Sequence, residues 1–254
     1  MKLEDKRILI TGGGSGIGLE LARRLADNNQ VIISGRDEAK LERARTQRPT
    51  MHTRRLDVTS EDEARAAIAW VRSEFAGLDL LVNNAGLLRP YALSTDAAAA
   101  QSVEDVEVNL IGTLRMTRLA LPLLEASFGG TVVFMSSAVA LAAVPGFAVY
   151  AATKAAVHSL ARSLRAELKP SGIRVVEVLP PVVDTEPVHT IDAPKLPPGA
   201  VAEAIIAGIE LDREEIRVGP VRQLAPLARI APRLADRIVT RALTPAAPEP
   251  SPRD

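Results

Sequence analysis

Short runs of apolar residues alternate with longer segments of mixed polarity along most of this chain. The apolar runs are mostly continuous rather than interrupted by polar residues, which is typical of strands buried on both faces of a parallel sheet. We therefore expect strands at residues 8–10, 31–33, 52–56, 80–82, 132–135, 175–179 and 215–218.

Helical spacing fills the intervals between these runs. Apolar residues recur every three or four positions in segments 17–25, 68–75 and 110–114, and residues 57–63 offer an N-cap followed by acidic residues. Acidic side chains at that point interact favourably with the helix dipole. The alternation of strands and helices predicts an α/β fold, a doubly wound parallel sheet with helices on both faces.

The amino-acid composition excludes several classes of protein for this chain. The 254 residues include 31 Lys and Arg against 31 Asp and Glu, so no net charge favours binding to nucleic acid. Cysteine is absent, which excludes disulfides, thiolate nucleophiles and cysteine-ligated metal centres. No stretch approaches the ~20 apolar residues of a membrane span, and the first residues contain no apolar signal core. We expect a cytoplasmic protein that contacts neither nucleic acid nor membrane.

The chain shows no repeat and no Gly/Ser linker, so residues 1–243 are expected to form a single domain with a core at 3–220. Residues 221–243 carry apolar positions at helical spacing that alternate with arginines, and Pro226 and Pro232 are expected to break this segment into short pieces. It is interpreted as a subunit interface or active-site flap, as simple packing, or as a membrane-surface segment, against which the prolines argue. Residues 244–254, with four prolines, are expected to be disordered.

A glycine-rich turn follows the first strand. Residues 11–18 read T-G-G-G-S-G-I-G and lead directly into a predicted helix. Glycine permits positive φ and lets backbone N–H groups approach an anion at a helix N-terminus. The spacing is T-G-x-x-x-G-x-G rather than the G-x-G-x-x-G of the common dinucleotide fingerprint, and a plain tight turn is the alternative.

The end of the second strand bears on which dinucleotide is bound. Gly35 stands where an acidic residue would bind the ribose hydroxyl of NAD(H), and Arg36 follows it. Because a guanidinium matches a phosphate geometrically, the sequence favours NADP(H), with NAD(H) also possible. Alternatively, Arg36 stacks on adenine or lies in solvent, and Asp37 is expected to neutralise it in part.

Tyr150 and Lys154 are four residues apart in a predicted helix, which puts them on one face. A phenol has a pKa of about 10, and a nearby ammonium favours its ionised form. Alone this spacing indicates no more than a solvated helix face. However, Ser137 follows a strand, Asn109 interrupts an apolar helical pattern, and residues 83–86, N-N-A-G, follow another strand.

In this order these motifs resemble those of the short-chain dehydrogenase/reductase family, including the thirteen positions between Ser137 and Tyr150. The resemblance covers about residues 3–220 and implies a Rossmann-type fold and NAD(P)-dependent conversion between a ketone or aldehyde and an alcohol. Residues 33–36, the stretch around His158 and residues 179–185 are similar to a bacterial subgroup. It is named after an oxidoreductase of the lipoteichoic acid D-alanylation operon.

The resemblance also implies residue roles. Tyr150 is the general acid or base, Lys154 lowers its pKa and binds the nicotinamide ribose, Ser137 holds the substrate carbonyl, and Asn109 anchors a water. The remaining implied cofactor contacts are with the pyrophosphate (Gly12, Ser15, Gly16, Ile17, Gly18), the adenine (Asp57, Val58), the cofactor groove (Asn84, Ala85, Gly86) and the carboxamide end (Val183, Thr185).

Pro181 departs from the family pattern, because it replaces a glycine after the sixth strand. No metal is expected, since His52 and His158 show no ligand spacing with an acid. The expected partners are a small carbonyl or alcohol substrate and further copies of the chain, in a homodimer or homotetramer. A catalytically silent dinucleotide-binding regulator is the alternative function.

Overall fold

Buried apolar strands form the centre of the molecule, as the sequence pattern predicts. The computed structural model describes residues 1–127, 129–186 and 193–243. Within them a seven-stranded sheet, parallel throughout, has the order β3-β2-β1-β4-β5-β6-β7. The strands are β1 (Arg7–Thr11), β2 (Gln30–Gly35), β3 (His52–Arg55), β4 (Leu80–Asn83), β5 (Thr131–Met135), β6 (Arg174–Leu179) and β7 (Glu215–Arg217).

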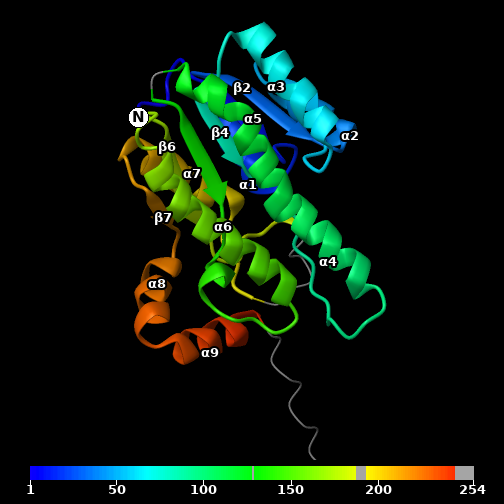
Figure 1. The fold of residues 1–254 in the computed structure, drawn as a ribbon, viewed down its shortest axis with the longest axis vertical. Helices are drawn as coiled ribbons and strands as arrows, with labels where there is room; N and C mark the ends of the chain where they lie inside the picture. Colours follow the sequence, from blue (N-terminus) through cyan, green and yellow to red (C-terminus); the bar gives the residue numbers. More distant parts are fainter. Residues whose placement is uncertain (128, 187–192, 244–254) are drawn as a thin grey trace, which may run out of the picture.

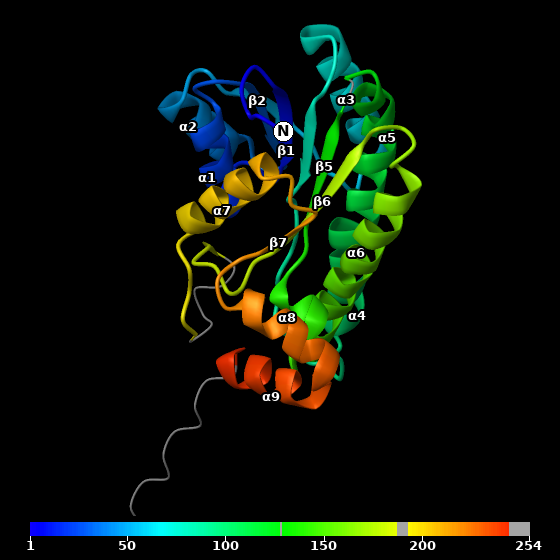
Figure 2. The same cartoon turned by 90° about the vertical axis from the view of Figure 1, so that its left-hand side faces the viewer.

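Helices cover both faces of the sheet, and the doubly wound α/β fold is confirmed (Figures 1 and 2). One face is covered by α1 (Gly16–Leu25), α2 (Glu38–Gln47) and α7 (Pro198–Glu210), and the other by α3 (Glu61–Phe75), α5 (Thr113–Glu125) and α6 (Ala148–Glu167). Side chains alternate along each strand, so Ile8 and Ile10 join one apolar core while Leu9 joins the other.

The strand order reverses between β1 and β4, since β2 and β3 extend to one side and β5 to β7 to the other. Parallel α/β sheets bind ligands at the carboxyl ends of the strands beside such a switch point. The glycine turn follows β1, the Asn-Asn-Ala-Gly segment overlaps the end of β4, and Ser137 follows β5. The fold therefore gathers three distant motifs at one edge.

The segment that carries Asn109 is a π-helix. It spans Glu107–Gly112 and joins α4 (Ala98–Val106) to α5 without a break. Short π-helical turns within α-helices are frequent at functional sites. The widened turn accounts for the polar residue that interrupts the apolar pattern, because Asn109 is buried there and faces the strand ends.

Two C-terminal helices lie beyond the carboxyl end of the sheet (Figure 2). Contrary to the sequence expectation, Pro226 does not end a helix, because it lies inside α8 (Val221–Ile230), while Pro232 is the first residue of α9 (Pro232–Leu243). Proline is favoured at a first helical position. At Pro226 the lost hydrogen bond is offset by packing, since Leu224 and Ala225 of the same helix are buried.

These helices are fastened to the segment between β5 and α6. Their buried residues join Val139, Val144 and Phe147 in a third apolar cluster. The Ala143 N–H donates to Asp236 Oδ1 at 2.8 Å, and Thr240 Oγ1 donates to the Ala143 carbonyl at 3.3 Å. Among the described residues, no helix combines the length and apolar character needed to cross a membrane. The expected tail at 244–254 lies outside the described residues.

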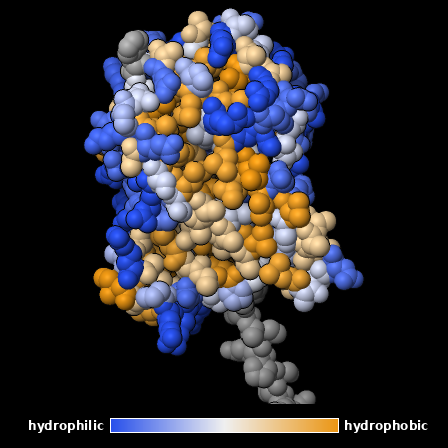
Figure 3. Space-filling model, in the orientation of Figure 1, coloured by the Kyte–Doolittle hydropathy of each residue, from blue (hydrophilic) through white to orange (hydrophobic). Residues whose placement is uncertain are grey.

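Apolar side chains also gather on the outer surface. Figure 3 shows them along the middle of the face that α5 and α6 form. Val103 and Val106 of α4 and Leu114 of α5 are exposed large apolar residues. Exposed apolar surface is typical of protein–protein contacts, and the homo-oligomer stays a prediction.

Candidate active site

The glycine turn forms one end of the site and is shaped to bind an anion. Gly12 has φ +64°, and a Cβ there would come 2.8 Å from the Cα of Ala85, so a larger residue would close the turn. Ser15 is the N-cap of α1 but makes no capping hydrogen bond to a described residue, and the first turn contains no acidic residue. Free N–H groups and the helix dipole at this end suit the pyrophosphate of a dinucleotide.

The turn is tied to the loop after β4 by side-chain hydrogen bonds. Asn84 Nδ2 donates to the carbonyls of Thr11 and Gly12, both at 3.0 Å. The Thr11 hydroxyl oxygen accepts from the backbone N–H groups of Asn84 and Ala85 at 3.0 and 3.1 Å. Thus Asn84 holds the turn in place, and Gly18 packs behind it against the Asn84 side chain.

Tyr150, Lys154 and Ser137 meet at the other end of this groove. Lys154 is buried, and its Nζ donates to the Met135 carbonyl at the end of β5 at 2.8 Å. The same Nζ lies 5.7 Å from the centre of the Tyr150 ring, and Ser137 lines the same cavity as Tyr150. The helical spacing of four residues therefore brings phenol and ammonium into one site, as the sequence predicts.

Burial has the largest effect on the acidity of both Tyr150 and Lys154. Burial raises the pKa of Tyr150 to about 12, although the nearby Ser137 hydroxyl lowers it, and burial lowers the pKa of Lys154 to about 8. Lys154 is not among the influences that act on the pKa of Tyr150 here, and the hypothesis that Lys154 lowers this pKa stays a prediction. Removal from water disfavours the charged form of both groups, and the ammonium directs its hydrogen bond to Met135.

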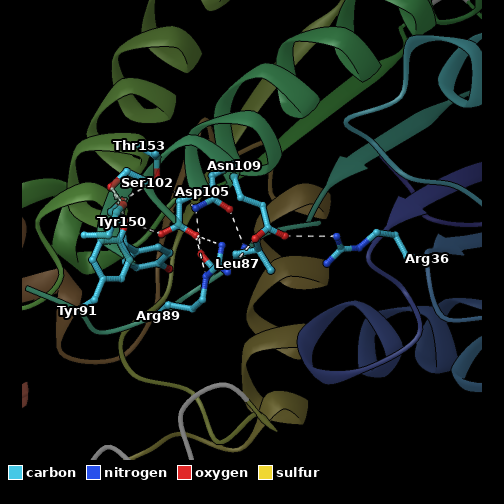
Figure 4. Close-up of polar contacts among 11 residues, drawn as sticks. Arg36, Leu87, Arg89, Tyr91, Ser102, Asp105, Asn109, Tyr150 and Thr153 are labelled. Atoms are coloured by element: carbon cyan, nitrogen blue, oxygen red, sulfur yellow. Dashed lines mark hydrogen bonds and ion pairs between the residues drawn. The ribbon is translucent and has the colours of Figure 1, made fainter. Parts of the chain in front are cut away.

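Asn109 connects the loop after β4 to the helix that carries Tyr150. Its Oδ1 accepts from the Leu87 N–H at 2.7 Å, and its Nδ2 donates to the Leu87 carbonyl at 2.9 Å and to Thr153 Oγ1 at 3.2 Å (Figure 4). The Thr153 hydroxyl in turn donates to the Tyr150 carbonyl at 2.8 Å. Asn109 thereby positions α6 relative to the loop, and its expected role in holding a water stays a prediction.

A cavity of about 530 Å³ joins the glycine turn to the phenol and continues to α8 and α9. Most of the predicted site residues line it, namely Gly12, Ser15, Gly16, Ile17, Asn84, Ala85, Gly86, Ser137, Tyr150, Lys154, Val183 and Thr185. Those that lie outside its lining are Gly18, Arg36, Asp57, Val58 and Asn109. Its far wall is formed by apolar residues of the third cluster, among them Leu88, Val139, Phe147, Leu224 and Val239.

The two prolines after β6 keep this wall in place. The Pro180 carbonyl accepts from the Ala138 N–H at 2.9 Å, which joins the segment to the residues that follow Ser137. Val183 pairs with Leu196 in a short parallel bridge, and a Cβ at Gly16 would lie 3.0 Å from the Thr185 side chain. The loop thus reaches the glycine turn despite the proline at position 181.

Arg36 lies at the outer end of the groove and has a partner that the sequence did not indicate. Its Nη1 is 3.6 Å from Glu104 Oε1 on α4 (Figure 4). Asp37 was expected to neutralise Arg36 but caps α2 instead, accepting from the Lys40 N–H at 3.0 Å. Asp57 lies near Arg36, whose charge is one of several influences that lower the pKa of Asp57 although burial raises it.

A buried acid anchors the segment beyond Leu87. Asp105, fully buried, accepts from Arg89 at 3.0 and 2.6 Å and from the Tyr91 hydroxyl at 2.9 Å. Arg89 also pairs with Glu104 at 2.8 Å. Arg89 and Tyr91 thus join Asp105 and Glu104 of α4 in one polar network, and no local sequence pattern indicates these contacts.

A second polar cluster lies under α6. His158 Nδ1 is 2.9 Å from both carboxylate oxygens of Glu177, and these groups and Glu215 lie within 4.8 Å of one another. The sequence spacing gave no sign of this acidic partner, because it comes from strand β6 rather than from a neighbouring turn. None of the three residues lines the cavity, and catalysis without a metal stays a prediction.

Comparison with known proteins gives consistent matches. The short chain dehydrogenase family matches residues 6–195. "Uncharacterized oxidoreductase DltE" of Bacillus subtilis (strain 168) is 37% identical over 188 residues, which cover 73% of this chain and 74% of that protein.

Two solved structures are similar over most of the chain. A short chain dehydrogenase from Burkholderia cenocepacia J2315 in complex with NADP has a TM-score of 0.84 and 29% identity, covering 96% of this chain and 100% of that one. A 3-ketoacyl-(acyl-carrier-protein) reductase from Brucella melitensis complexed with NADH has a TM-score of 0.79 and 30% identity, covering 85% of this chain and 98% of that one.

Proposed function

Because this chain belongs to the short chain dehydrogenase family and is an NAD(P)-dependent oxidoreductase, we propose that it interconverts a carbonyl compound and an alcohol, with Tyr150 transferring the proton. Its similarity to DltE places it in the subgroup named after that oxidoreductase. The observation that carries the proposal is the shared cavity, in which Tyr150, Ser137 and Lys154 face the space that continues to the glycine turn.

Ser137 and Tyr150 have different roles in the proposed reduction. When bound, the nicotinamide dinucleotide supplies the hydride. Ser137 holds the carbonyl oxygen by a hydrogen bond, and the Tyr150 hydroxyl donates its proton to that oxygen as negative charge develops. Burial raises the pKa of Tyr150 to about 12, so the phenol keeps its proton at neutral pH and is ready to act as an acid. In the oxidation direction the same group must first lose that proton, so oxidation gains from alkaline pH.

The cavity wall supports a substrate class. Among the described lining residues Lys154 is the only one with a charged side chain, and its Nζ is bonded to the Met135 carbonyl. A carboxylate or phosphate on the substrate would find no charged partner in the wall formed by α8, α9 and Phe147, where Gln223 is the one polar side chain among the described lining residues. We therefore infer that the substrate is an uncharged carbonyl compound with an apolar substituent.

This proposal predicts turnover of apolar ketones. Carbonyl compounds should be screened with NADPH and with NADH, and turnover followed by the absorbance of the reduced nicotinamide. The screen should pair each oxo ester with the corresponding free oxo acid. We expect kcat/KM to be about 100-fold lower or more for the acid, because an unpaired charge in the apolar wall costs several kcal/mol. Dinucleotide binding without turnover of any carbonyl or alcohol would instead support the silent regulator.

We also propose that NADP(H) is preferred, with Arg36 binding the 2′-phosphate. Arg36→Ala should raise the KM for NADPH about tenfold. This factor is at the lower end of the range for losing a hydrogen bond to a charged group, because Arg36 is half-exposed. The KM for NADH should change less than about twofold. Steady-state kinetics with both cofactors test this, and equal effects on the two would contradict the preference.

A further inference from the structure

The ion pair between Arg36 and Glu104 connects the two elements that border the outer end of the groove. Arg36 directly follows β2, whereas Glu104 lies on α4, which is on the other side of the switch point (Figure 4). Both side chains are about half-exposed, at 50% and 44%. The group proposed to bind the 2′-phosphate therefore already faces a carboxylate.

Glu104 is held in this position by a second arginine. Arg89 Nη1 lies 2.8 Å from Glu104 Oε2, while the other carboxylate oxygen faces Arg36. Arg89 is itself fixed by the fully buried Asp105. The hydrogen bond from Arg89 is the main influence that holds the pKa of Glu104 below its usual range. The carboxylate is thus ionised at neutral pH and cannot turn away without losing Arg89.

We propose that Glu104 is a specificity-determining residue for the cofactor, because its carboxylate competes with the 2′-phosphate for Arg36 and so moderates the preference for NADP(H) over NAD(H). The inference rests on the proposed function and refines its cofactor site. A phosphate brings a charge close to −2 to a position where Glu104 already contributes −1. NAD(H) has a hydroxyl at this position and does not meet that repulsion, so Glu104 acts on one cofactor only.

The test is Glu104→Gln, which removes the charge and keeps an amide oxygen for Arg89. We expect the Kd and KM for NADPH to fall about three- to fivefold at low salt, in the range of exposed ion pairs, with less than about a twofold change for NADH. The gain should shrink as ionic strength rises. Glu125→Gln on α5 is the matched control, because it removes one exposed negative charge elsewhere. A second variant, Glu104→Ala, should raise NADPH affinity as Glu104→Gln does.

A double-mutant cycle shows whether Glu104 acts through Arg36. In an Arg36→Ala background, Glu104→Gln should give at most a small part of its gain for NADPH. An unchanged ratio of NADPH to NADH affinity in Glu104→Gln, or a full gain without Arg36, would overturn the proposal. Failure of the proposed function is distinguishable, because the unsubstituted protein would then turn over no carbonyl or alcohol with either cofactor, whereas the effect of Glu104 is measured by the binding of NADPH and NADH.

Discussion

Replacing Tyr150 with phenylalanine should reduce kcat by about 10²–10⁴-fold, the range of a positioned general acid. The substitution removes one hydroxyl and keeps the ring that packs beside the third apolar cluster. Without that hydroxyl, the carbonyl oxygen has no acid to neutralise its developing charge, and Ser137 is left to stabilise it alone. The dissociation constant for NADPH should stay within a few-fold, because the glycine turn and Asn84 are unchanged.

Tyr91→Phe is the matched control for this experiment. Tyr91 is the other tyrosine of the sequence, and its hydroxyl donates to Asp105 at 2.9 Å rather than facing the cavity. Its loss removes one hydrogen bond of a buried acid, so it should lower thermal stability while kcat stays within about threefold. If Tyr150→Phe retained the turnover of the unsubstituted protein, or if both variants lost it equally, Tyr150 would not be the proton donor.

Local patterns were sufficient to predict the sheet, whereas the central residues of the candidate site were predicted from several local motifs whose order resembles that of the short-chain dehydrogenase/reductase family. A strand buried on both faces must be apolar along its length, so runs such as residues 8–10 and 132–135 are visible without a structure. The spacing of Tyr150 and Lys154 is likewise a local property of one helix, and the structure confirms that both face one cavity. The glycine turn was predictable from local sequence as well, because a positive φ such as that of Gly12 favours glycine at that position.

Contacts between distant segments could not be predicted in the same way. Glu104 meets Arg36, and Glu177 meets His158, only because the sheet order brings separate elements together. A spacing of four residues likewise shows that two groups are near each other but not how burial shifts the pKa of each. Pro226 was misjudged because the burial of its neighbours Leu224 and Ala225 offsets the lost hydrogen bond.

Lys154 should give the reduction reaction a descending pH limb. Burial lowers the pKa of Lys154 to about 8, so its ammonium loses its charge as the pH rises through that value. Tyr150, with a pKa of about 12, remains protonated over the same range and cannot cause the fall. We expect log kcat/KM for NADPH to be level near neutral pH and to fall with a slope of about −1 above pH 8, because this parameter reports groups of the free enzyme.

Lys154→Met separates this interpretation from a general loss of stability at high pH. It removes the ammonium that donates to Met135, and kcat/KM at pH 7 should fall about 10- to 100-fold, the value of a hydrogen bond from a charged group. The descending limb near pH 8 should disappear in this variant. The control is Lys169→Met, which changes an exposed lysine just beyond the end of α6. That control should keep both the rate at pH 7 and the descending limb. A limb that persisted without Lys154 would have to arise from another group. The ammonium would then not be the titrating charge that reduction requires.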